Sequence, residues 1–194
     1  MRTLDVLLKW VPRPKAVAKT ADIARTEGEA VYIYDRHERL SGMSVTDQFT
    51  GQTGLTGIGY QGYDLASFLA QLSAEGVSLL VDVRLNPISR KRGFSKRALA
   101  EALDSVGIGY EHARPLGNPK ENRAGFGGGP SELRDARQRF AEELDAPAAR
   151  EWLSAIAGWA TERRVALLCF EAEQERCHRD VVADAIAAEV HRFG

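Results

Sequence analysis

Residues 77–83 read VSLLVDV, a mostly apolar run with one acid, Asp82, close to its end. A strand that is covered on both faces lacks the apolar–polar alternation of a half-exposed strand, because both sets of its side chains are buried. Residues 164–170, RVALLCF, have the same character. Two runs of this kind predict a mostly parallel sheet that lies between layers of helices.

Helical patterns and short strands alternate around these two runs. A strand predicted at 55–60 precedes a helix that Asp64 can cap, and a helix that Ser95 can cap precedes a strand at 108–112. Further helices are predicted at 131–144, from Pro147 onwards, and over 178–192. Residues 113–130 fit neither pattern and predict a long irregular loop. We therefore expect a three-layer, Rossmann-like α/β fold, with a mostly parallel sheet of about four or five strands and helices on both faces.

Residues 1–52 differ from the rest of the chain. They begin with a basic segment that contains Pro12-Arg13-Pro14, and they end in a stretch rich in Gly, Ser, Thr and Gln. Neither composition favours regular structure. We expect a poorly structured or loosely packed N-terminal extension over 1–52, and a single α/β domain over 53–194.

The composition restricts the cellular setting more than the function. The formal net charge of −1 predicts no partner, so any surface that binds nucleic acid must be local. Two cysteines cannot form a disulfide framework, which favours a reducing compartment. The start of the chain has no long apolar region, and no run is long enough to span a membrane. We expect a cytoplasmic protein without a signal peptide or a membrane partner; the sequence predicts no oligomeric state.

A basic segment follows the strand that ends near Asp82. Between Arg84 and Arg97 the chain has six basic residues and no acid, together with two serines, Ser89 and Ser95. The N-terminus of the helix after Ser95 would add free N–H groups that favour anions. A solvated loop and a phosphate-binding loop both fit this pattern. Asp82 needs a partner if it is buried, and Arg84 points to the same face if the strand continues.

The second polar stretch follows the strand at 164–170. Glu171 comes two residues after Cys169, and Cys177, His178 and Arg179 then begin the last helix. A cysteine at a helix start beside cationic groups has a lowered pKa, so Cys177 is a candidate nucleophile. Glu171 is predicted either to pair with Arg84 or Arg179 or to act as a general base. Cys169 is predicted to be a small buried core residue.

Two other interpretations of the cysteines fit less well. Cys169, Cys177 and His178, with His112 as a fourth, are ligand types for zinc, but their spacing matches no standard pattern, and an adjacent Cys-His pair rarely binds one metal. We therefore predict no metal. The acids after Cys169 would repel a phosphate, which argues against a phosphatase-like or rhodanese-like loop around that cysteine.

Four stretches together resemble the domain of unknown function 488 family over about residues 55–191. They are IGYQGYDLASFL (58–69), VSLLVDVRLNPISRKRGFSK (77–96), IGYEHARPLGNPKENR (108–123) and VALLCFEAEQERCHRDVVADAI (165–186). The resemblance implies a compact α/β fold but no known reaction. The motif positions that it carries onto this chain are Gly59, Tyr60, Asp82, Arg84, Pro87, Ser89, Leu116, Gly117, Cys169, Glu171, Cys177, His178 and Arg179. All of them fall at strand ends or in the loops that follow.

Ligands of open parallel sheets bind beyond the carboxyl ends of the strands. We therefore expect a site there that binds or processes a phosphate-bearing ligand, a nucleotide or a nucleic acid, without a cofactor. A thiol-dependent enzyme that uses Cys177 and a non-catalytic interaction module are the alternatives; the residues favour an enzyme but define no reaction class. The candidate catalytic residues are Asp82, Arg84, Glu171, Cys177 and His178. The candidate ligand-binding residues are Tyr60, Ser89, Arg90, Lys91, Arg92 and Arg179.

Overall fold

The computed structural model describes residues 53–193, so the extension expected at 1–52 lies outside the described residues. Four parallel strands form one sheet in the order β1-β4-β2-β3. The strands are β1 (Gly54–Gly59), β2 (Leu79–Asp82), β3 (Gly109–His112) and β4 (Arg164–Cys169). Every residue of the central strands β2 and β4 is buried, which confirms that their apolar runs are covered on both faces.

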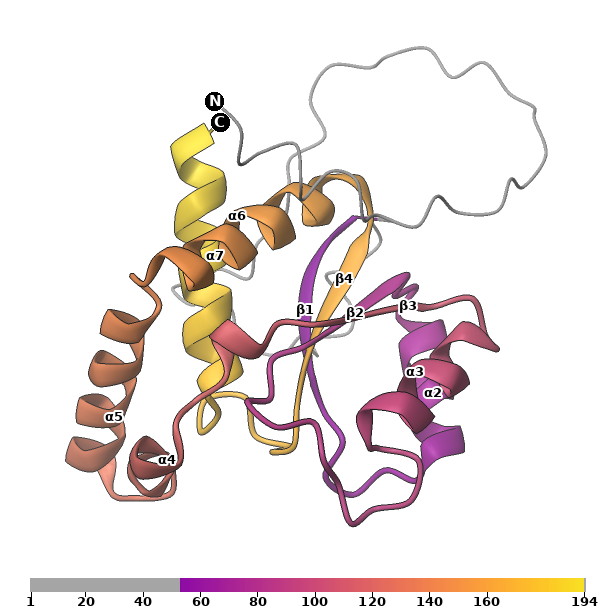
Figure 1. Cartoon of the computed structure of the whole chain (residues 1–194), viewed down its shortest axis with the longest axis horizontal. Coiled ribbons are helices and arrows are strands. Elements are labelled where there is room, and N and C mark those ends of the chain that lie inside the picture. Colours follow the sequence, from indigo (N-terminus) through magenta and orange to yellow (C-terminus); the bar gives the residue numbers. More distant parts are fainter. Residues whose placement is uncertain (1–52, 194) are drawn as a thin grey trace, which may run out of the picture. The chain divides into compact units, whose positions relative to one another are not determined.

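Helices cover both faces of the sheet (Figure 1). They are α2 (Leu65–Ala74), α3 (Lys96–Asp104), α4 (Lys120–Phe126), α5 (Pro130–Glu143), α6 (Pro147–Glu162) and α7 (His178–Phe193), with a 3₁₀ turn, η3, at Arg114–Leu116. Alternate residues of β4 face opposite sides: Val165 and Leu167 belong to the core cluster under α5, α6 and α7, and Ala166 and Leu168 to the cluster under α2 and α3. The expected three-layer α/β fold is confirmed.

The prediction of an irregular loop over 113–130 is wrong, because this segment contains η3 and α4. The sequence of α4 has no strong apolar periodicity, and the helix is stabilised by contacts with α5. Phe126 packs edge-on against Phe140 of α5, with ring centroids 6.4 Å apart. The buried Asn122 side chain donates to the carbonyl of Ala136 at 2.9 Å. Short helices of this kind depend on packing more than on propensity.

Candidate functional site

The carboxyl ends of the strands bring the two polar stretches to one edge of the sheet. Tyr60 donates its backbone N–H to Cys169 at 3.3 Å, and Val83 donates to Leu168 at 3.1 Å, so the chain stays paired just beyond the strands. Gly59 is required at the end of β1, since a Cβ there would lie 1.7 Å from the carbonyl oxygen of Glu171. The loop after β4 therefore packs directly on β1.

Both cysteines, Glu171 and His178 meet in a cluster that we call the thiol cluster. The Oε2 atom of Glu171 lies 3.0 Å from Sγ of Cys169 and 3.2 Å from Sγ of Cys177. The two sulfurs lie 3.7 and 3.8 Å from Nδ1 of His178. Cys169 is buried as expected, but its sulfur faces polar groups rather than apolar core.

The imidazole of His178 has a defined orientation. Its Nε2 lies 2.9 Å from the carbonyl oxygen of Val83, which can only accept, so Nε2 carries a proton. In the neutral ring Nδ1 is then unprotonated, and its lone pair points toward the two sulfurs. The edge-on ring of Phe140, at a centroid distance of 5.3 Å, helps to fix the plane of the imidazole.

The electrostatics of the thiol cluster shift the pKa values of its two thiols in opposite directions. The hydrogen bond from Cys169, with help from His178 and Arg179, outweighs burial and lowers the pKa of Cys177 to about 6. The same thiol–thiol bond, together with burial and the charge of Glu171, raises the pKa of Cys169. Burial opposes ionisation of Glu171, but the bonds from the thiols outweigh it and lower the pKa of that carboxyl. The cluster thus favours negative charge on Glu171 and Cys177, beside the buried Arg179.

Asp82 and Arg84 form a buried ion pair, as the sequence predicts. The guanidinium donates from Nε to Oδ1 at 2.8 Å and from Nη2 to Oδ2 at 2.5 Å. Its Nη1 donates to the hydroxyl of Tyr60 and to the carbonyl of Phe94. Burial disfavours the charged guanidinium, but the bonds to Asp82 outweigh this effect and raise the pKa of Arg84. All of these donors are used within the fold; the catalytic role of Asp82 and Arg84 remains a prediction.

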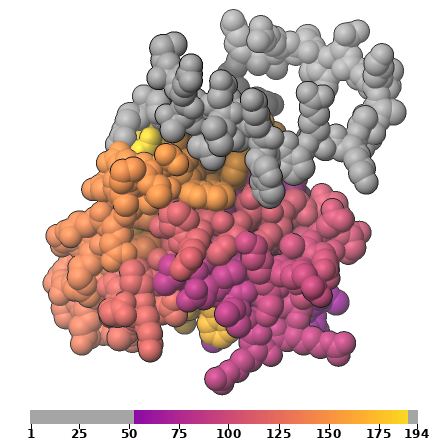
Figure 2. Space-filling model, in the orientation of Figure 1, coloured from indigo at the N-terminus to yellow at the C-terminus, as the bar shows by residue number. Residues whose placement is uncertain are grey.

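The basic segment forms an anchored loop with exposed cations; we call residues 85–95 the basic loop. Ser89 and Ser95 bond each other, because Ser95 Oγ donates to the Ser89 carbonyl at 3.1 Å instead of capping α3. Lys91 Nζ donates to the Tyr60 carbonyl at 3.2 Å. By contrast, Arg90 and Arg92 are exposed. The loop between β2 and α3, magenta in Figure 2, lies at the surface at the lower edge of the view.

Arg179 lies inside the fold, and its expected role as a ligand-binding residue stays a prediction. It is only 1% exposed, and its two Nη atoms donate to the backbone carbonyls of Glu171 and Ala172. The ion pair expected between Glu171 and either Arg84 or Arg179 does not form among the described residues, because the Glu171 carboxylate accepts from the two thiols and Arg84 pairs with Asp82. Arg179 instead holds the loop after β4 in position.

Two residues of this edge, Tyr110 and Phe94, were not singled out by the sequence, and a third, His112, was considered only as a fourth metal ligand. Tyr110 donates its hydroxyl to Asp82 Oδ2 at 2.7 Å; burial and the charge of Asp82 raise the pKa of this tyrosine. Phe94 stacks on Tyr60 with ring centroids 4.5 Å apart. His112 places Nε2 2.9 Å from the carbonyl of Arg84. The sequence signal that could have identified Tyr110 and Phe94 was their aromatic character near the basic segment.

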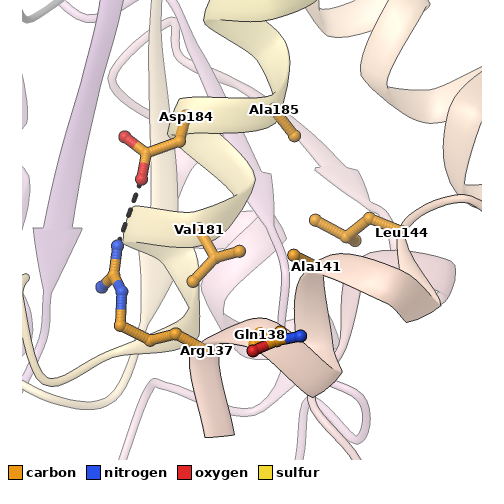
Figure 3. A pocket seen from close by; sticks show the side chains of 7 residues that line it. All are labelled: Arg137, Gln138, Ala141, Leu144, Val181, Asp184 and Ala185. Carbon is orange, nitrogen blue, oxygen red and sulfur yellow. Dashed lines mark hydrogen bonds and ion pairs between the residues drawn. The ribbon is translucent and has the colours of Figure 1, made fainter. Parts of the chain in front are cut away.

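A cavity of about 430 Å³ lies elsewhere, between α5 and α7 (Figure 3). Its lining includes the apolar side chains of Leu144, Val181 and Ala185, and Arg137 at its border donates to Asp184 at 3.1 Å. None of the predicted site residues lines it. In the part of the chain that the structure describes, no helix is long and apolar enough to cross a membrane.

A family model described as "Domain of unknown function DUF488" matches residues 64–186. That range includes β2, β3, β4 and all but the last turns of α7. It contains the basic loop and the thiol cluster. No curated protein and no solved structure matches the chain.

Proposed function

Because the chain belongs to the DUF488 family, whose description assigns no reaction, we propose a function from the site itself: the domain binds a nucleic-acid strand through the basic loop. The arginines of this loop contact the phosphates, and the neighbouring apolar side chains contact the bases. The sequence predicted a phosphate-bearing ligand, either a nucleotide or a nucleic acid, and the proposal selects the nucleic acid.

The availability of Arg90 and Arg92 carries the proposal. Both side chains are exposed, and among residues 53–193 neither has an ion-pair partner. Three other exposed arginines of the described domain, Arg97, Arg134 and Arg150, have acidic neighbours, whereas three more, Arg114, Arg123 and Arg139, form no ion pair with the described residues. Guanidinium groups without a carboxylate partner are the groups that neutralise phosphates.

The anchoring of the loop supports the same conclusion. The Ser89–Ser95 bonds and the bond from the Lys91 N–H to Ser89 Oγ fix the backbone on either side of Arg90, and Nζ of Lys91 ties the loop to the Tyr60 carbonyl. A fixed loop loses little conformational entropy when it binds, so more of the electrostatic attraction remains as affinity.

Apolar side chains at this edge favour a strand over a single phosphate. Ile88 is 83% exposed and precedes the arginines, and Phe170 is 45% exposed where it meets Tyr60 edge-on at 5.2 Å. Exposed aromatic and aliphatic groups beside cations can stack on or pack against bases. The loop is too exposed to enclose a mononucleotide, whereas a strand can lie across it.

The test is fluorescence anisotropy with a fluorescein-labelled oligodeoxythymidine, titrated with the full chain at several salt concentrations. Each phosphate contact to single-stranded DNA contributes about 0.7 to the slope of log K against log salt. Arg90→Ala/Arg92→Ala should therefore lower the slope by about 1.4 and weaken binding about 25-fold at 0.1 M salt. The matched control is Arg134→Ala/Arg163→Ala, which removes the same charge from arginines outside the basic loop.

Two results would contradict the proposal. One is a wild-type chain that does not bind the oligonucleotide at low salt. The other is an equal loss of affinity in both double variants, because the attraction would then come from the net charge rather than from the loop. Tight binding of a mononucleotide, without any for the oligonucleotide, would instead favour a small-molecule site.

A further inference from the structure

We propose that the thiol cluster is a binding site for a divalent metal ion of the zinc type, with Cys169, Cys177 and His178 as ligands and Glu171 as the fourth. The site goes beyond the proposed function and does not depend on it, since its groups are distinct from those of the basic loop.

The spacing of the donor atoms fits one small ion. The two sulfurs and a ring nitrogen of His178 all lie within 4.8 Å of one another. With Zn–S of about 2.3 Å and Zn–N of about 2.0 Å, tetrahedral geometry separates sulfur and nitrogen by about 3.5 Å. The observed separations of 3.7 and 3.8 Å are close to that value. The Glu171 oxygen lies 3.0 and 3.2 Å from the sulfurs, but Glu171 is outside the group of three residues whose donor atoms all lie within 4.8 Å of one another, so its carboxylate has to shift toward His178 to become the fourth ligand.

The orientation of His178 is an independent observation. Histidines that bind metals usually donate their second ring N–H to a carbonyl or carboxylate, which fixes the tautomer and aims the other nitrogen. The Nε2–Val83 bond at 2.9 Å provides this contact from a neighbouring strand. Nδ1 thereby faces the two sulfurs, at 3.7 and 3.8 Å.

The fold also removes the objection that adjacent Cys and His rarely bind one metal. Cys177 is the residue before α7, and His178 is the first residue of that helix. The turn that starts the helix brings Sγ and Nδ1 of these neighbours within 3.8 Å of each other. Cys169 ends β4 and His178 begins α7, so two of the ligands stand on regular elements, whereas Glu171 and Cys177 lie in the segment between them.

Burial favours metal binding over nucleophilic catalysis. Cys177 is 1% exposed and Cys169 4%, whereas reactive cysteines are partly accessible to their substrates. Two thiolates, a carboxylate and a neutral imidazole carry three negative charges, which a divalent cation and the nearby Arg179 balance. Thiolate and imidazole ligands favour zinc over magnesium or calcium.

The experiment uses the full chain, stripped of metal with a chelator under reducing conditions and then titrated with Co²⁺ and Zn²⁺. Tetrahedral Co²⁺ with two thiolates gives visible d–d bands and a strong near-ultraviolet charge-transfer band. We expect one Co²⁺ per chain with this spectrum, and its displacement by Zn²⁺. Cys177→Ser should weaken affinity by at least about 100-fold, since loss even of an outer-shell contact costs 10–100-fold. His112→Gln, whose imidazole is outside the cluster, should bind as the wild type does.

Alkylation provides a second measurement that needs no variant. Bound Zn²⁺ should slow the labelling of both cysteines by iodoacetamide in the native wild-type chain. If the wild-type chain takes up no Co²⁺ or Zn²⁺ with micromolar affinity, the proposal is wrong. It is also overturned if Cys177→Ser retains the wild-type cobalt spectrum, or if, at a reagent concentration that alkylates Cys177 of the metal-free chain, bound Zn²⁺ does not slow that alkylation.

Discussion

Replacing Asp82 by alanine should destabilise the domain strongly, because it leaves the charge of Arg84 buried without its partner. Asp82 is fully buried, and its two carboxylate oxygens accept from Nε and Nη2 of Arg84 and from the hydroxyl of Tyr110. Removal of one partner of a buried ion pair costs about 3–5 kcal/mol. That is a large part of the 5–15 kcal/mol by which domains are typically stable.

The assay is urea unfolding followed by circular dichroism. With a slope of about 2 kcal/mol/M, a loss of 4 kcal/mol moves the midpoint by about 2 M. The double variant Asp82→Leu/Arg84→Met removes both charges and should recover much of this loss, since well-packed apolar residues can replace a buried pair. Glu101→Ala, which removes the partner of the exposed Arg97, should change stability by less than about 0.5 kcal/mol.

A loss below about 1 kcal/mol for Asp82→Ala would refute this reasoning, because Arg84 would then have found water or another partner. The same result would favour a ligand-facing role for the pair. Failure of the double variant to recover any stability would show that Tyr60 and Tyr110 depend on the pair for their own positions.

The remaining predictions concern packing at the same edge. Gly59→Ala should destabilise the domain by about 1–3 kcal/mol or more, because the added Cβ would overlap the Glu171 carbonyl. Gly158→Ala lies within α6 with open space around it, so this variant should stabilise the domain by about 0.8–1.0 kcal/mol. A comparison of their thermal melts checks both, and equal effects would contradict the close approach at β1. Phe94→Ala should cost about 3–5 kcal/mol in urea unfolding, since this fully buried ring stacks on Tyr60; a cost near that of a surface substitution would show that the stack contributes little.

The sequence was sufficient for the sheet because its central strands are apolar throughout. β2 and β4 could be recognised from their runs alone, and the buried Asp82 required a partner, which Arg84 supplies. The helix start at His178 was also confirmed. These features depend on residues that are neighbours in the sequence.

What the sequence did not predict depends on contacts between distant segments. α4 is stabilised by Phe140 and Ala136 of α5, so its own periodicity is a poor guide. The sequence spacing of Cys169 and Cys177 argues against a metal site only when the conformation of the loop between them is unknown, because that conformation sets the distance between the two sulfurs. Arg179 positions that loop by donating to its carbonyls, a contact that the sequence did not predict.

The most direct test of the proposed site is an amide chemical-shift titration of the ¹⁵N-labelled chain with the oligodeoxythymidine. We expect the shifts to concentrate in residues 85–95 and around Phe170, and to decrease as salt is added. Shifts confined to α5 and α6, or a spectrum that does not change at low salt, would contradict the account.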